Sequence, residues 1–306
     1  MLHYIEKIYE FYYVGLIMNS FFLKRKNNED TFYSQIRDCN ERAETKEQIE
    51  YFWRIYRPYV QGKESNFLDK AQMKGYFKQC WWEMVLSIGL LNVGANIKNK
   101  NTEKGPDILI EDLEETSLKI YIEAIAPKEG VTEDKLPEMP WGYDITLPEN
   151  KFLFRASGAF IEKHKKYKSY IKNNTICEKD IYIIAISACN LGEYGSLMDY
   201  PCPTLFKFLV GAGNQVLSPK GAFVEYRPQI MKGDIPIEMN CFLKNKYNGI
   251  SAVLYSNTNI LGCPDKPEKT FIILRNPLAK NPLPNKIFKG IKIWNFDKEH
   301  KCWIKK

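Results

Sequence analysis

The chain has 306 residues, of which 44% are hydrophobic and 26% charged, and its formal net charge is +7. This composition excludes an intrinsically disordered chain and is typical of a globular protein with a substantial core. The eight cysteines are scattered without a C-x-x-C pair and only three histidines are present, which argues against a zinc cluster and favours reduced thiols in a cytoplasmic compartment.

The N-terminal region is predicted to be helical. Apolar residues recur at three- and four-residue spacing from Tyr4 to Tyr12, and the helical pattern extends over residues 1–62. An apolar run at residues 11–23 is too short to span a bilayer, and nothing resembles a secretory signal peptide. A helix packed on the body of the protein and an interfacial or partner-binding helix both fit this run, and we expect no membrane span.

The next predicted helix runs from about Asp69 to Leu91. Its expected core face consists of Tyr76, Cys80, Met84, Ser87 and Leu91. Glu83 lies at the border of that face rather than on the opposite, solvated side.

A β-hairpin carrying two carboxylates is predicted next. The turn Gly105-Pro106 places Asp107 at the start of one strand, and Glu123 follows within "LKIYIEAIAP". Alternation along this strand puts Ile120, Ile122 and Ala124 on one face, and Tyr121, Glu123 and Ile125 on the other. A carboxylate on an apolar face is costly to bury unpaired, so Glu123 requires a cation, a hydrogen-bond network or a shifted pKa.

The remaining elements predict an α/β fold with a central mixed sheet flanked by helices. A Pro- and Gly-rich loop at residues 128–150 is long enough to be a functional flap. A helix from about Lys151 to Lys172 and an apolar strand, "DIYIIAISACN", follow it. We expect a single domain, with an N-terminal helical layer (1–68), a core (69–192) and an irregular, β-rich C-terminal extension (193–306).

One lysine of the helix at residues 151–172 lies on its apolar side. Projected at about 100° per residue, Lys163 falls near the middle of the apolar face. A lysine there either meets an acidic partner on the sheet, for which Glu123 and Asp107 are available, or extends its ammonium past the helix edge. Both interpretations remain open at this point.

The segments "WWEMVLSIGLL", "GPDILI", "IYIEAIAP", the lysine-bearing helix and "YIIAISA" together resemble the core of the PD-(D/E)XK nuclease superfamily, the restriction-endonuclease-like fold of many bacterial proteins. The resemblance covers roughly residues 70 to 190. In that fold an Asp and a Glu lie on adjacent strands, matched here by Asp107 and Glu123, and a preceding helix carries an acid, for which Glu83 is the candidate.

This chain departs from the family at Ile125, where the motif lysine is expected. Migration of that lysine to a neighbouring helix is a known variation in the superfamily, which makes Lys163 its candidate replacement. The resemblance implies cleavage of DNA or RNA, with Mg²⁺ (or Mn²⁺) held by Asp107, Glu123 and the carbonyl of Ala124 or Ile125. It further implies that the metal activates a water and neutralises the phosphate, and that Lys163 orients or deprotonates that water or stabilises the transition state.

Four further lysines of the same helix are candidate contacts to a nucleic-acid backbone: Lys165, Lys166, Lys168 and Lys172. A solvated helix face is the alternative interpretation of this basic group. The missing motif lysine also favours a second function, a catalytically inactive nuclease-fold protein that acts as a binding or assembly module. A homo-oligomer is compatible with either function.

Overall fold

The computed structural model describes residues 20–99, 105–111, 118–137, 147–191, 203–218, 221–297 and 302–305. The predicted helix from Tyr4 to Tyr12, most of the apolar run at 11–23 and the centre of the loop at 128–150 lie outside these residues. Among the helices that are described, none is long and apolar enough to cross a membrane.

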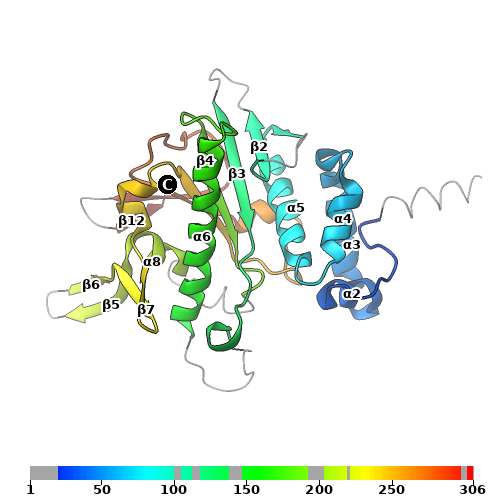
Figure 1. Ribbon diagram of the computed structural model, residues 1–306, viewed down its shortest axis with the longest axis horizontal. Coiled ribbons are helices and arrows are strands. Elements are labelled where there is room, and N and C mark those ends of the chain that lie inside the picture. The colour runs from blue at the N-terminus through cyan, green and yellow to red at the C-terminus, as the bar shows by residue number, and fades with distance from the viewer. Residues whose placement is uncertain are drawn as a thin grey trace, which may run out of the picture.

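A mixed sheet of eight strands forms the centre of the described structure, in the order β1-β2-β3-β4-β9-β10-β11-β12 (Figure 1). The strands are β1 (Ile97–Lys98), β2 (Ile108–Glu111), β3 (Lys119–Ile125), β4 (Ile181–Ser187), β9 (Ala252–Ser256), β10 (Ile272–Arg275), β11 (Lys292–Asp297) and β12 (Cys302–Lys305). Strands β3, β4 and β9 run parallel, as do β10 and β11, and the other neighbours are antiparallel. The predicted central mixed sheet is therefore confirmed.

Helices cover both faces of this sheet. They are α2 (Thr31–Asp38), α3 (Ala43–Tyr56), α4 (Glu64–Gln72), α5 (Phe77–Asn92), α6 (Glu149–Lys172) and α8 (Thr204–Val210). One buried cluster joins α5 to the sheet and a second joins α6 and α8 to its opposite face. Figure 1 shows α3 and α4 on the outer side of α5. Because both faces are covered, every residue of β4 is buried, as expected for a central strand with parallel neighbours.

Two hairpins accompany the sheet on the side of α8 (Figure 1). They consist of β5 (Ala212–Ser218) with β6 (Gly221–Tyr226), and of β7 (Gln229–Lys232) with β8 (Ile235–Glu238). The C-terminal part of the chain, expected to be an irregular, β-rich extension, provides β9 to β12 of the central sheet. The open edge of β4 explains this arrangement, since an unpaired apolar strand needs a neighbour to satisfy its backbone.

The helix predicted from Asp69 to Leu91 is two helices, α4 and α5. The break lies at residues 73–76, where Gly75 adopts a φ of 78°. This left-handed conformation ends a helix and is accessible to glycine without steric cost. As a result Tyr76, expected in the core, is 40% exposed.

The packing of α5 leaves no space for a side chain at Gly89. A Cβ at this position would lie 2.6 Å from Cζ of Phe271 and 3.2 Å from the backbone nitrogen of Glu268. We therefore expect Gly89→Ala to lower the free energy of unfolding by about 2 kcal/mol through overpacking. Chemical denaturation measures this change.

Gly158 in α6 provides the matched control, because nothing lies within 4 Å of a Cβ added there. Gly158→Ala is expected to stabilise the protein by about 0.5–1 kcal/mol, since glycine is a poor helix former. A Gly89→Ala protein as stable as the wild type would contradict the close approach of α5 and Phe271.

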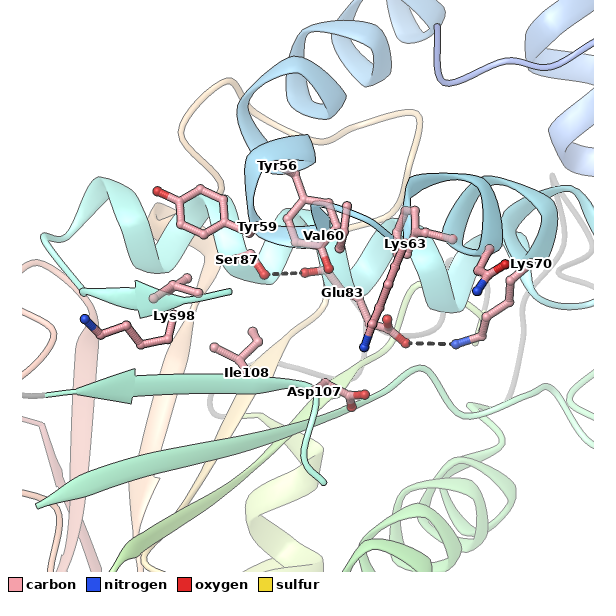
Figure 2. Close-up of a pocket in the computed structure, with 13 residues that line it drawn as sticks. Tyr56, Tyr59, Val60, Lys63, Lys70, Glu83, Ser87, Lys98, Asp107 and Ile108 are labelled. Atoms are coloured by element: carbon pink, nitrogen blue, oxygen red, sulfur yellow. Dashed lines mark hydrogen bonds and ion pairs between the residues drawn. The ribbon is translucent and has the colours of Figure 1, made fainter. Parts of the chain in front are cut away.

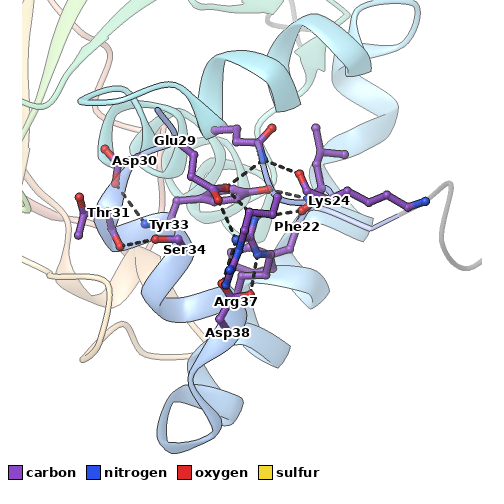
Figure 3. A network of polar contacts seen from close by, with 12 residues as sticks. Phe22, Lys24, Glu29, Asp30, Thr31, Tyr33, Ser34, Arg37 and Asp38 are labelled. Atoms are coloured by element: carbon purple, nitrogen blue, oxygen red, sulfur yellow. Dashed lines mark hydrogen bonds and ion pairs between the residues drawn. The ribbon is translucent and has the colours of Figure 1, made fainter. Parts of the chain in front are cut away.

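A buried ion pair fastens the N-terminal helices together (Figure 3). Arg37 in α2 donates two hydrogen bonds to Glu29, of 2.6 and 2.9 Å, and both side chains are 9% exposed. These hydrogen bonds lower the pKa of Glu29 below its ordinary value. The side chain of Gln72 in α4 donates to Glu29 and to the carbonyl of Lys24. The network therefore links α2, α4 and the segment that precedes α2.

We expect His164 in α6 to make the free energy of unfolding depend on pH. It is 5% exposed and its ring lies 4.7 Å from that of Tyr247. Burial, reinforced by the nearby charges of Lys168 and Lys246, lowers its pKa to about 4. An unfolded histidine has a pKa of about 6.5, so below that pH the unfolded state takes up the proton first.

We expect His164 to remove about 3 kcal/mol of stability as the pH falls from about 6.5 to 4, with the full contribution present above pH 6.5. His164→Phe, which keeps an aromatic ring, is expected to flatten this part of the profile. Urea denaturation at a series of pH values measures both proteins. Parallel profiles for wild type and variant would contradict the assignment.

Candidate functional site

Glu123 is held by three side chains of α6. It is 1% exposed. Its Oε1 accepts hydrogen bonds from Nζ of Lys163 at 2.9 Å and of Lys166 at 3.0 Å, and its Oε2 accepts one from the hydroxyl of Tyr170 at 3.3 Å. The three donors are spaced i, i+3 and i+7, so they form one stripe along the helix. Of the two alternatives that the sequence left open for Lys163, the structure shows the contact with Glu123, and Lys163 itself is 6% exposed.

Lys166, a candidate contact to a nucleic-acid backbone, binds Glu123 in the structure. Its side chain is 45% exposed, yet its ammonium reaches Glu123. Partial burial lowers the pKa of Lys166, but the charge and hydrogen bond of Glu123 outweigh this effect and raise it. Lys165, Lys168 and Lys172 are exposed, as expected. A contact between these lysines and nucleic acid stays a prediction.

The alternation predicted for β3 is confirmed and determines which groups share a face. Ile120, Ile122 and Ala124 pack in the cluster beneath α5, and Ile125 and Tyr121 pack in the cluster beneath α6. Glu123 points to α6, whereas Glu83 comes from α5. These two acids therefore lie on opposite faces of the sheet, and the structure does not bring them together.

Asp107 lies at the edge of β3, between the two faces. It directly precedes β2, whose first residue Ile108 pairs with Ile122. Oδ2 of Asp107 accepts a hydrogen bond of 2.8 Å from the backbone nitrogen of Ala124. The side chain thus supplies the acceptor for β3 at the point where the backbone ladder of β2 stops. Asp107 is consequently placed beside the residue that follows Glu123.

The charge of Asp107 also affects a group on the α6 side of the sheet, the hydroxyl of Tyr170. Burial and the charge of Glu123 raise the pKa of Tyr170, and Asp107 adds to that increase. On the α5 side, Asp107 lines a pocket of about 180 Å³ together with Glu83 (Figure 2). Asp107 thus lines the same pocket as Glu83 and binds the residue that follows Glu123.

Glu83 is itself engaged on the α5 side. Its carboxylate is 3.4 Å from Nζ of Lys70, and its side chain is 12% exposed. Gln79, one turn earlier in α5, donates to Glu83 Oε1 at 3.0 Å and to the carbonyl of Ala124 at 3.2 Å. Oε1 of Gln79 accepts from the backbone nitrogen of Ala126 at 2.8 Å. Gln79 therefore caps the open edge of β3 beyond Asp107.

Gln79 and Tyr170 were not recognised in the sequence. The only local signal for Gln79 is its spacing of four residues from Glu83, and for Tyr170 its spacing of seven from Lys163. Such spacings place residues on one helix face, but the strand beneath that face is decided by packing.

The oxygen donors on and beside β3 are of the kind that a hard divalent cation binds. Mg²⁺ binds one or two carboxylates and keeps several waters. Asp107, Glu123 and the carbonyl of Ala124 offer these types of ligand. Within the part of the chain that the structure describes, no group of three or more His, Cys, Asp or Glu side chains gathers at one point. Because two ammonium groups already contact Glu123, a cation there has to displace one of them, and half-exposed Lys166 is the more readily moved.

The comparisons with known proteins identify no relative. No protein-family model, curated protein or solved structure matches this chain. The positions and contacts of its own residues are therefore the basis for the function proposed below.

Proposed function

We propose that this protein is a metal-dependent nuclease with a restriction-endonuclease-like core that cleaves phosphodiester bonds in DNA or RNA. The element order supports the proposal, because α5 is followed by β1, β2, β3, α6 and β4, and these four strands are neighbours in this order. The observation that carries it is the contact of buried Lys163 with Glu123, one residue from the backbone nitrogen that binds Asp107.

In this function Asp107, Glu123 and the Ala124 carbonyl are the groups that hold Mg²⁺ or Mn²⁺. When bound, such a cation lowers the pKa of a water and neutralises charge on the phosphate. Lys163 holds a positive charge beside Glu123, where it can orient a water or stabilise the developing negative charge. The side chain of Lys166 is half-exposed, so its ammonium can leave the carboxylate of Glu123 and bind a phosphate oxygen instead.

A second function is favoured by the same contacts. Both Lys163 and Lys166 are hydrogen-bonded to Oε1 of Glu123. Their positive charges compensate the carboxylate without a metal ion. A catalytically inactive nuclease-fold protein that binds nucleic acid or assembles with a partner is consistent with this closed ion cluster. The exposed lysines of α6 would then provide the contacts to phosphate.

Cleavage and binding assays separate the two functions. Purified protein is incubated with single- and double-stranded DNA and RNA in the presence of Mg²⁺, Mn²⁺ or EDTA. The nuclease function predicts cleavage with a divalent cation and none with EDTA. Salt-dependent binding without cleavage under every condition would support the inactive module that binds nucleic acid. Absence of both cleavage and binding would contradict the nuclease and that module alike.

A further inference from the structure

The pocket on the α5 side of Asp107 contains a buried ammonium group. The pocket lies between α4, the short helix at Arg57–Val60 and the start of β2 (Figure 2). Lys63, the residue that directly precedes α4, and Lys70 within α4 both line it. Glu83 and Asp107 line it from α5 and from the start of β2.

Lys63 has no hydrogen-bond partner among the residues that the structure describes, although its Nζ is buried. Figure 2 shows its side chain extending into the pocket toward Glu83 and Asp107. Glu83 is occupied by Lys70 and Gln79, and Asp107 binds the nitrogen of Ala124. A buried ammonium without an acceptor is costly, so a ligand with anionic oxygen atoms suits this position.

The other lysines of the pocket do have partners. Nζ of Lys98 lies 3.3 Å from Glu111, and Nζ of Lys70 lies 3.4 Å from Glu83. Lys63 is therefore the ammonium of this pocket to which the described residues supply no acceptor. This contrast distinguishes an anion-binding position from a general basic surface.

The size of the pocket restricts the ligand. Its volume is about 180 Å³, whereas pockets that enclose a drug-sized molecule measure about 300–1,000 Å³. A phosphate group with its ester oxygen fits, but a complete nucleotide does not. Because Nζ of Lys63 is buried, a phosphate at the end of a strand reaches it more readily than one flanked by nucleotides on both sides.

We propose that this pocket binds the terminal phosphate of a nucleic-acid strand, with Nζ of Lys63 donating to a phosphate oxygen. The inference rests on the proposed nuclease function, because Asp107 belongs both to the pocket and to the proposed cation site. A strand anchored in this way has its end beside Asp107, so the enzyme degrades strands with a phosphorylated end in preference to strands with hydroxyl ends.

The test measures binding in EDTA, so that no strand is cleaved. Fluorescent single-stranded oligonucleotides carry a 5′-phosphate, a 3′-phosphate or hydroxyl groups at both ends, and inorganic phosphate serves as competitor. We expect one phosphorylated end to bind about ten-fold more tightly than the hydroxyl ends, in line with a hydrogen bond to a charged group. Inorganic phosphate at millimolar concentration is expected to remove that preference.

Lys63→Met is expected to abolish the preference while binding of the hydroxyl-ended strand stays within two-fold of wild type. The matched control is Lys74→Met, which removes an exposed positive charge just beyond α4 and is expected to keep the preference. Thermal unfolding verifies that both variants fold. Lys63→Met is expected to leave the melting temperature unchanged or to raise it, since it removes a buried, unsatisfied ammonium.

Three outcomes would overturn the inference. In the first, the wild type binds all oligonucleotides with equal affinity. In the second, Lys63→Met loses affinity for all of them equally. In the third, a phosphoserine peptide binds as tightly as the phosphorylated strand. The double variant Glu123→Gln/Lys163→Met, which lies on the other face of the sheet, separates this inference from the proposed function. It is expected to lose cleavage and to keep its tighter binding of strands with a phosphorylated end. If the wild-type protein has this binding preference but no nuclease activity, the proposed phosphate pocket is supported and the proposed nuclease function is wrong.

Discussion

Asp107→Asn is expected to reduce nucleic-acid cleavage by about three orders of magnitude, the loss typical of removing one group that stabilises charge at a reacting centre. The amide retains an oxygen that can accept from the nitrogen of Ala124, and the hydrogen bond of 2.8 Å at the edge of β3 is thereby preserved. The variant loses the negative charge that a divalent cation requires. Initial rates in Mg²⁺ measure the effect.

The matched control is Glu178→Gln, because the side chain of Glu178 is 71% exposed and lies after the end of α6. This variant is expected to cleave at the wild-type rate. Thermal unfolding of all three proteins shows whether a loss of rate reflects a loss of fold. If Asp107→Asn cleaves at the wild-type rate, Asp107 does not belong to the active site, and the cation site proposed at this edge of the sheet is wrong.

Lys163→Met is expected to lower the free energy of unfolding by about 3 kcal/mol, because it leaves the buried carboxylate of Glu123 with one ammonium partner in place of two. Methionine has a similar length and suits the apolar face of α6, so the change tests the charge rather than the packing. The double variant Glu123→Gln/Lys163→Met removes both buried charges and is expected to recover most of the lost stability. Urea denaturation of the wild type, Lys163→Met, Glu123→Gln and the double variant gives the coupling energy.

Lys168→Met is the matched control in the same helix, since Lys168 is exposed and its replacement is expected to change stability by less than about 0.5 kcal/mol. Cleavage by the Lys163→Met protein, assayed well below its unfolding midpoint, is expected to fall by about 10²-fold or more. Loss of stability with unchanged cleavage would identify Lys163 as a structural ion-pair partner. A variant as stable as the wild type would show that Lys166 and Tyr170 suffice to hold Glu123.

The two sets of contacts around β3 have different consequences for function. On the α6 side, Glu123 is enclosed by Lys163, Lys166 and Tyr170, which form a compact, compensated cluster. On the α5 side, the pocket contains an ammonium that lacks a partner among the described residues. Asp107 lies at the edge between them. A phosphate entering from the α5 side thus approaches the strand that carries Glu123.

Local periodicity determined which faces of their elements Lys163 and Glu123 occupy. The 3.6-residue period of a helix places Lys163 on its apolar face. The two-residue period of a strand places Glu123 on the face of β3 opposite to that of Ala124. Both periods are properties of short segments. They left two places for the ammonium of Lys163, a contact with an acid on the sheet or a position past the helix edge, and the packing of α6 on β3 decided for Glu123. The Gly-Pro turn likewise determined that Asp107 lies next to the start of β2.

Tertiary packing alone decided the remaining features. Whether Lys166 contacts Glu123 depends on how closely α6 lies on β3, because a long lysine side chain can extend its ammonium either into solvent or to the sheet. The addition of β9 to β12 to the sheet depends on pairing between segments far apart in the chain, which no local period encodes. The position of Lys63 beside Asp107 likewise follows from the packing of α4 on α5. Sequence patterns specify which face of an element is apolar, whereas the side chains that meet there depend on which elements pack together.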